Sequence, residues 1–186
     1  MNENDRILYF RFHKERDEAA LSALIDRHRE SLTKFLYGFV RNMEDAEELA
    51  VDTFAVISSG TAKYVERRDV SFKTWLFAVG RNQARLFLRK RKVIHVPLYD
   101  DPGHSAESPE ELFLKKGRDS QLFQAMERLK PEYRQVLYLM YFEEMDHKEI
   151  GRVMKKSVKQ IYNLATRGRK SLRDILERME SDDTKY

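Results

Sequence analysis

The stretch that decides the fold lies at residues 145–176 and reads MDHKEIGRVMKKSVKQIYNLATRGRKSLRDIL. Its apolar residues have the spacing of two short helices that cross at a turn near residues 155–157. They are Ile150, Val153, Met154, Val158 and Ile161. Every charged residue in 151–173 is basic. This pattern predicts a helix-turn-helix whose second helix enters a DNA major groove.

The whole chain has the composition of a helical protein with one good core or two small ones. It has 186 residues, of which 41% are hydrophobic and 35% are charged. The formal net charge is only +4, because 35 basic residues nearly balance 31 acidic ones. Acids and bases nevertheless occupy separate blocks of sequence, and this segregation indicates separate faces for two different partners.

Several classes of protein are disfavoured by what the sequence lacks. There is no cysteine, which excludes disulfides and thiolate metal sites. The N-terminal residues do not form a signal peptide, and no apolar run approaches the roughly 20 residues that span a bilayer. We therefore expect a cytoplasmic protein without membrane insertion. No glycine-rich phosphate loop, nucleophile elbow or zinc-protease motif is present, so we do not expect an enzyme.

The N-terminal part of the chain, residues 1–92, contains three predicted helices. Residues 15–40 have apolar residues at helical spacing, and Asn42 caps a second helix whose outer side is acidic. Acids near a helix N-terminus are also favoured by the helix dipole, so a merely solvated face remains an alternative. Ser71 caps a third helix that runs to about Lys92.

The third helix gathers basic residues on the side opposite its apolar ones. They are Arg81, Arg85, Arg89 and Lys92, with no acid between the first and the last. Like charges on one helix face repel one another, which indicates an anionic ligand such as a nucleic acid backbone. A solvated basic face is the alternative.

Residues 93–111 hold three of the four prolines and have the composition of a linker. His95 and His104 lie in this segment, but two histidines without thiolates or paired carboxylates make a poor metal site. We predict no metal and no cofactor.

In the C-terminal part, residues 112–186, one helix covers about 112–129, another starts at Lys130–Pro131, and Asp146 caps the helix that contains Ile150. The predicted fold class is all-α, with two small helical domains joined by a flexible linker, the C-terminal one containing the helix-turn-helix.

The order of these features resembles the extracytoplasmic-function (ECF) type of bacterial RNA polymerase sigma factor, within the sigma-70 family. The resemblance covers about 21–92 and 112–176. Its N-terminal part is MEDAEELAVDTF (43–54) followed by FKTWLFAVGRNQARLFLRKRK (72–92). Its C-terminal part is LKPEYRQVLYLMYFEEMDHKEIGRVM (129–154) and the recognition helix after it. One departure lies at Lys155, where many relatives have glycine. A left-handed backbone conformation in this turn is energetically costlier for lysine than for glycine.

The resemblance implies promoter recognition and initiation of DNA melting by a dissociable subunit of RNA polymerase. The implied partners are the polymerase core, through its β′ clamp helices and β subunit, and promoter DNA, with an anti-sigma factor in many members. The implied polymerase contacts are Asp45, Glu47, Glu48 and Asp52. The loop before the third helix would capture a flipped base of the −10 element through Lys63, Tyr64, Arg67 and Arg68, with Tyr64 stacking on the base. The third helix would hold the −10 phosphates and the separating strand through Arg81, Asn82, Arg85 and Arg89.

The recognition helix would read the −35 element. Residues near its N-terminus face base edges, which makes Lys159, Gln160 and Asn163 the predicted readers. Arg167, Arg169 and Lys170 would contact phosphates, and Ser157 would cap the helix and direct its N-terminus at a phosphate. Two alternatives are a stand-alone helix-turn-helix regulator of duplex DNA and a helical protein–protein adaptor. Neither needs an acidic helix followed by a basic one, so that pair argues against both.

Overall fold

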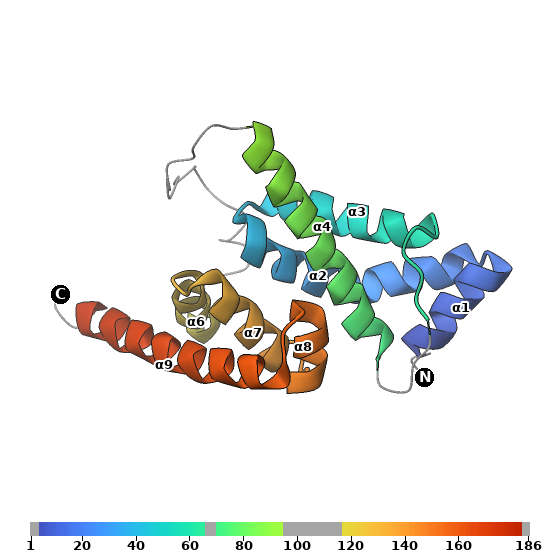
Figure 1. Ribbon diagram of the computed structural model, residues 1–186. Helices are drawn as coiled ribbons and strands as arrows, with labels where there is room; N and C mark the ends of the chain where they lie inside the picture. The colour runs from blue at the N-terminus through green and yellow to red at the C-terminus, as the bar shows by residue number, and fades with distance from the viewer. Residues whose placement is uncertain (1–3, 66–69, 95–116, 184–186) are drawn as a thin grey trace.

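The computed structural model describes residues 4–65, 70–94 and 117–183, and within these ranges the chain is helical and contains no β-strand (Figure 1). The N-terminal half consists of α1 (Asp5–Glu15), α2 (Glu18–Val40), α3 (Met43–Ser58) and α4 (Phe72–Ile94). The C-terminal half consists of α6 (Gly117–Glu127), α7 (Pro131–Tyr141), α8 (His147–Met154) and α9 (Val158–Asp183). The all-α class is confirmed.

The N-terminal half is a bundle in which α2 is the central helix. It packs against α1, α3 and α4, and Leu32, Phe35 and Leu36 are among its fully buried side chains. Gly80 allows α4 to approach α2 closely, because a Cβ at this position would lie 2.8 Å from Leu32 Cδ1. The close crossing of these two helices therefore depends on the absence of a side chain at residue 80.

Helix starts follow the local signals. Asn42 Oδ1 accepts from the backbone N–H of Asp45 at 2.9 Å, and Ser71 Oγ accepts from that of Thr74 at 3.1 Å. Asp146 and Glu149 form a reciprocal capping box at the start of α8. The Glu149 N–H is the main cause that lowers the pKa of Asp146 below its ordinary value of 3.8, so this cap acts across neutral pH. The caps predicted at Asn42, Ser71 and Asp146 are confirmed.

Helix α1 was not predicted. The spacing of apolar residues indicates only one helix before Asn42, over residues 15–40. The chain instead breaks at Arg16, whose φ of 57° is left-handed, and Asp17 caps α2. Helix α1 contributes Tyr9 to an aromatic cluster that also contains Tyr64, Phe72 and Trp75. This cluster closes the end of the N-terminal half where the loop before α4 returns to the bundle.

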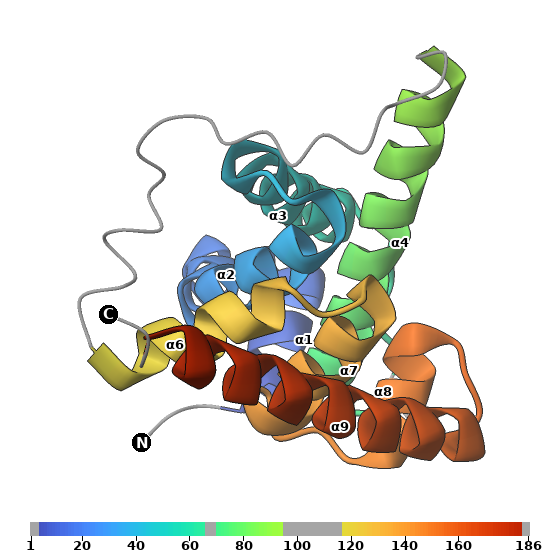
Figure 2. The ribbon, with the colours of Figure 1, turned by 90° about the vertical axis from the view of Figure 1, so that its left-hand side faces the viewer.

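The C-terminal half is built around the contact of α7 with α9 (Figure 2). Gly168 lies at this contact, where a Cβ would be 3.3 Å from both Tyr133 and Leu137 side chains. Helices α8 and α9 form the predicted helix-turn-helix, and Lys155 ends α8 in the left-handed conformation with a φ of 53°. The turn at Lys155 is therefore confirmed, although lysine replaces the glycine that this geometry favours.

The two halves pack against each other and share one continuous hydrophobic core. Helix α8 lies against the lower part of α4 in the view of Figure 1, and α7 packs on α2. The Tyr138 hydroxyl donates to the backbone carbonyl of Ser31 at 2.9 Å across this contact. Sequence patterns predict two domains but contain no sign of how they meet.

Candidate nucleic-acid interface

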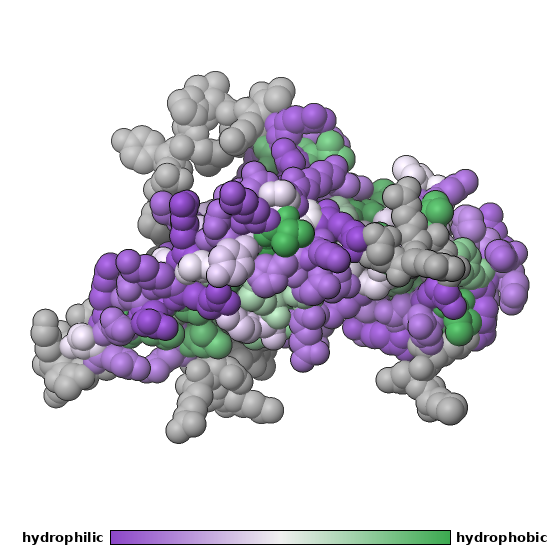
Figure 3. Space-filling model, turned by 60° about the horizontal axis from the view of Figure 1, so that its bottom comes forward, coloured by the Kyte–Doolittle hydropathy of each residue, from purple (hydrophilic) through white to green (hydrophobic). Residues whose placement is uncertain are grey.

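The recognition helix α9 presents most of its predicted contact residues to solvent. Ile161 and Ala165 are fully buried against the rest of the half, while the predicted reader and phosphate positions are exposed. The exposed ones are Ser157, Lys159, Gln160, Asn163, Arg167, Arg169 and Lys170. The underside of the molecule, which includes this helix, is dominated by hydrophilic residues (Figure 3). The structure thus brings the predicted −35 residues onto one accessible helix.

Gln160 has a second role in addition to its predicted contact with a base. Its Oε1 accepts from the backbone N–H of Ser157 at 2.8 Å, and Ser157 Oγ accepts from the Gln160 N–H at 3.3 Å. This is a capping box at the N-terminus of α9. The predicted cap at Ser157 is confirmed. Asn163 takes no part in this cap, so it is the better candidate for contacting a base.

Two apolar residues on α9 were missed as contact candidates. Val158 is 48% exposed and Tyr162 is 58% exposed, one helical turn apart beside the predicted readers. Apolar side chains in a major groove contact the C5-methyl group of thymine. Sequence spacing placed Val158 among the apolar contacts of the two crossing helices, and its exposure shows that this part of the prediction is wrong. Both positions lie outside the 161, 165, 168 stripe that packs into the core.

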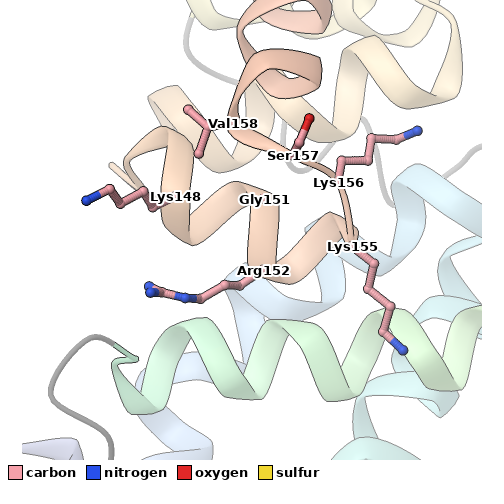
Figure 4. Close-up of a pocket in the computed structure, with 7 residues that line it drawn as sticks. All are labelled: Lys148, Gly151, Arg152, Lys155, Lys156, Ser157 and Val158. Atoms are coloured by element: carbon pink, nitrogen blue, oxygen red, sulfur yellow. The ribbon is translucent and has the colours of Figure 1, made fainter.

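The turn of the helix-turn-helix forms an open basic hollow of about 390 Å³ (Figure 4). Four cationic residues line it: Lys148, Arg152, Lys155 and Lys156. Gly151 forms its floor without a side chain, and a Cβ there would lie 2.8 Å from the carbonyl oxygen of Lys156. Lys156 also pairs with Glu132 of α7 at 3.0 Å. Together with the N-terminus of α9, the hollow offers positive charge to a phosphate group.

Helix α4 does not carry its arginines on one exposed face, and this part of the prediction is wrong. Arg85 and Arg89 are exposed, and Asn82 is half-buried. Arg81 is only 8% exposed, and its Nε and Nη1 have no hydrogen-bond partner in the described part of the chain. Burial, and then the neighbouring Arg85 guanidinium, lower the pKa of Arg81. The physical reason is tertiary: α4 packs against α2 and α3 of its own half and against α8 of the C-terminal half.

The loop before α4 also differs from the prediction at Tyr64. This side chain is 6% exposed, and its hydroxyl donates to the carbonyl of Val70 at 2.9 Å. Its backbone N–H donates to the hydroxyl of Tyr9 at 2.9 Å. Tyr64 therefore anchors the loop in the aromatic cluster, and the prediction that its ring is exposed for stacking is wrong for this conformation. Lys63 is exposed, whereas Arg67 and Arg68 lie outside the described residues.

The acidic side of α3 forms a separate surface, which we call the docking face. It comprises Glu44, Glu47, Glu48, Val51 and Asp52, all exposed. The fourth predicted contact, Asp45, is half-buried and pairs with Arg91 of α4 at 3.0 Å. Val51 was missed as a contact candidate although it is 61% exposed. An apolar side chain surrounded by carboxylates is typical of the centre of a protein–protein contact with a polar rim.

No cluster of three or more potential metal ligands occurs among the described residues, and His95 and His104 fall outside them. None of the helices in the described ranges is long and apolar enough to cross a membrane.

Two solved structures share this fold. The structure of CnrH in complex with the cytosolic domain of CnrY superposes with a TM-score of 0.66 at 23% identity. That match covers 94% of this chain and 98% of the other. The co-crystal structure of the sigma factor RpoE with the anti-sigma factor NepR from Bartonella quintana gives 0.61 at 16% identity, covering 84% and 96%.

Sequence comparisons identify the family. The model of sigma-70 region 2 matches residues 24–93, and that of sigma-70 region 4 matches residues 119–172. The chain is 25% identical to the ECF RNA polymerase sigma factor SigE of Mycolicibacterium smegmatis, over 89% of this chain and 66% of SigE. It is 23% identical to the ECF RNA polymerase sigma factor SigW of Bacillus subtilis, over 88% of this chain and 92% of SigW. The acidic helix α3, the basic helix α4 and the helix-turn-helix of α8 and α9 all lie within the two matched regions. The chain is therefore an RNA polymerase sigma factor of the ECF type, in the sigma-70 family.

Proposed function

We propose that residues 1–92 bind core polymerase and the −10 element, that residues 93–111 are the linker, and that residues 112–186 bind the −35 element. The observation that carries this assignment is the separation of charge in the structure. The acidic docking face lies on α3, whereas α4 carries the exposed Arg85 and Arg89 and α9 carries the exposed Lys159, Arg167, Arg169 and Lys170. An acidic face is attracted to a positive surface of a protein partner and repelled by the phosphates of DNA, so it orients the chain on that partner. The docking face then binds the β′ clamp helices of the polymerase. The polymerase supplies all catalysis, so this chain is not itself an enzyme. It acts in the cytoplasm, where the polymerase works.

The mechanism we propose is bipartite binding. Each half alone contacts DNA over a small area, and mounting both on one polymerase makes the second contact intramolecular, which raises overall affinity without any new contact. Near the −10 element, Arg85 and Arg89 hold phosphates while a base leaves the stack. Flipping a base costs a few kcal/mol, so pocket contacts and backbone charge pairing must offset it. Because the Tyr64 ring is buried, Lys63 is the described loop residue best placed to meet that strand.

Both structural neighbours were solved in complex with a second protein, the cytosolic domain of CnrY in one and the anti-sigma factor NepR in the other. We propose that this chain also has an anti-sigma protein as a partner. Its binding would occlude surfaces that the polymerase uses.

In vitro transcription tests the proposed function directly. We expect this protein, added to core polymerase, to start transcripts on a subset of promoters that core polymerase alone ignores. Tight binding of the free protein to duplex DNA, combined with no stimulation of core polymerase on any promoter, would instead support the stand-alone regulator.

The reader and phosphate roles on α9 predict two different kinds of defect. We expect Asn163→Ala to change the preference among −35 variants by about 5- to 150-fold at one base pair, since a bidentate contact contributes roughly 1–3 kcal/mol of discrimination. We expect Arg169→Ala to weaken all promoters alike and to reduce the slope of log affinity against log salt by about 1. Competition binding by the holoenzyme to a −35 library measures both effects. Equal losses on every sequence for both variants would overturn the assignment.

A further inference from the structure

The recognition helix α9 carries an uncharged row of residues along its exposed face. Val158 is 48% exposed and Tyr162 is 58% exposed, and a spacing of four residues places them one above the other on the same side of the helix. Thr166 continues this row and is also exposed. Its hydroxyl donates to the Tyr162 carbonyl at 2.9 Å, so the hydroxyl proton is used within the helix. We call Val158, Tyr162 and Thr166 the apolar stripe.

The surroundings of the apolar stripe are basic. Val158 is itself among the residues that line the basic hollow at the turn of the helix-turn-helix (Figure 4). Beside the stripe runs a second exposed row, Lys159, Asn163 and Arg167, which carries two cations. A surface that only held phosphates would gain affinity from cations in the stripe as well, because each neutralised phosphate adds to the electrostatic attraction. The uncharged stripe is therefore suited to a different part of the DNA.

The ring of Tyr162 is supported from the side of α8. Its centroid lies 6.1 Å from that of the His147 ring, at an interplanar angle of 35°. His147 is the first residue of α8, and its Nε2 is buried with no hydrogen-bond partner among the residues that the structure describes. A ring that already packs on one side loses less conformational freedom when a ligand covers its other side. Tyr162 is therefore partly ordered before it meets DNA.

The major groove offers one apolar group to such a stripe, the C5-methyl group of thymine. The other groups on the base edges are hydrogen-bond donors and acceptors, which an apolar side chain would remove from water without replacing the lost hydrogen bond. Val158 and Tyr162 are about 6 Å apart along the helix axis at 1.5 Å per residue, and successive base pairs are about 3.4 Å apart. The two side chains therefore span about two base-pair steps.

We propose that the apolar stripe selects thymine in the −35 element by contact of Val158 and Tyr162 with C5-methyl groups, while the flanking cations hold the phosphates. The proposal rests on the −35 role of the recognition helix given above, and it adds a base that is recognised without a hydrogen bond. Burial of one methyl group contributes a factor of about four in affinity. This factor is the thymine preference that we expect at each position that the stripe contacts.

Removal of single methyl groups from the DNA tests the proposal. The holoenzyme that this chain forms with core polymerase is first used to select a preferred −35 duplex from a randomised library. Each thymine of that duplex, on either strand, is then replaced in turn by 2′-deoxyuridine, which lacks only the C5-methyl group. We expect one or two positions at which the replacement lowers holoenzyme affinity by about 3- to 5-fold in competition binding.

Variants of the stripe assign each sensitive position to a residue. Val158→Ala and Tyr162→Ala should each bind the thymine and the uracil duplex equally well at the position that the residue contacts, because alanine leaves the methyl group in water. Tyr162→Phe keeps the ring and should keep the thymine preference. Both positions are exposed, and alanine has the highest helix propensity, so the variants should remain folded by circular dichroism.

Two controls separate recognition of the methyl group from a general loss of binding. Ile7→Ala removes an apolar side chain that is 45% exposed on α1, outside the recognition helix, and should change neither affinity nor thymine preference. Arg169→Ala removes a proposed phosphate contact, so it should weaken binding to the thymine and uracil duplexes alike and leave their ratio unchanged.

Three results would overturn the proposal. The first is a selected duplex in which no thymine methyl affects affinity, as expected if a protein partner rather than DNA covers the stripe. The second is a full thymine preference in both Val158→Ala and Tyr162→Ala. The third is loss of the preference in Tyr162→Phe, which would assign the recognition to the hydroxyl group. A holoenzyme that selects no −35 sequence at all would instead contradict the −35 role on which the proposal rests.

Discussion

Replacing Glu48 and Asp52 together by lysine should reduce binding to core polymerase by about 100-fold or more. Both carboxylates are exposed on the docking face, on either side of Val51. Charge reversal at such a surface replaces attraction by like-charge juxtaposition, which costs several kcal/mol, and each 1.4 kcal/mol is a factor of about ten. Fluorescence anisotropy of labelled protein titrated with core polymerase measures this loss. DNA binding by the recognition helix of the same variant should be unaffected.

The matched control is the pair Glu15→Lys and Glu18→Lys, which makes the same change of charge at exposed acids of α1 and α2. It should lower polymerase affinity by less than about threefold, since scattered surface charges contribute little. Circular dichroism should show that both double variants remain helical. If the α3 variant assembles as well as the control, the docking role of α3 is wrong.

Arg134→Ala should destabilise the protein by about 3–5 kcal/mol, the cost expected when one member of a buried charged network is removed. Arg134 is 5% exposed and donates to the carbonyls of Met126 at 2.9 Å, Glu127 at 2.7 Å and Leu129 at 2.8 Å. These carbonyls lie at the end of α6 and just beyond it. Its Nη1 also lies 3.5 Å from the carbonyl of Gly38 in α2. Burial, and then Arg41, lower the pKa of Arg134 to about 10, so it remains charged at neutral pH.

Urea denaturation followed by circular dichroism measures this loss of stability. Arg134→Lys should recover only part of it, because a single ammonium cannot reproduce the planar fork that reaches several carbonyls. The control is Arg128→Ala, at an exposed position on the neighbouring connection, which should change stability by less than about 0.5 kcal/mol. Equal effects of Arg134→Ala and Arg128→Ala would show that the carbonyl network does not stabilise the fold.

Features that depend on nearest neighbours in the chain could be predicted from the sequence. The caps at Asn42, Asp146 and Ser157 depend on a side chain reaching a backbone N–H two or three residues away, which a sequence pattern contains directly. The helix-turn-helix and the charge of its second helix follow from spacing within about 30 residues. For the same reason the order of residues alone reveals the acidic and basic blocks, and through them the family and its two kinds of partner.

The state of individual site residues was decided only by tertiary structure. Arg81 and Arg85 look equivalent on a helical projection, yet one is buried in the packed molecule and the other is exposed. Tyr64 looks like an exposed loop aromatic, but Tyr9, some 55 residues earlier, receives it into a core cluster. Asp45 is paired by Arg91 from another helix. Burial and pairing of this kind depend on which distant segments meet, and no local pattern contains that information. The sequence by itself therefore determined most of the helices, the segregation of charge and the family, whereas tertiary packing, within the N-terminal half and between the halves, decided which of the predicted contacts are available to DNA and polymerase.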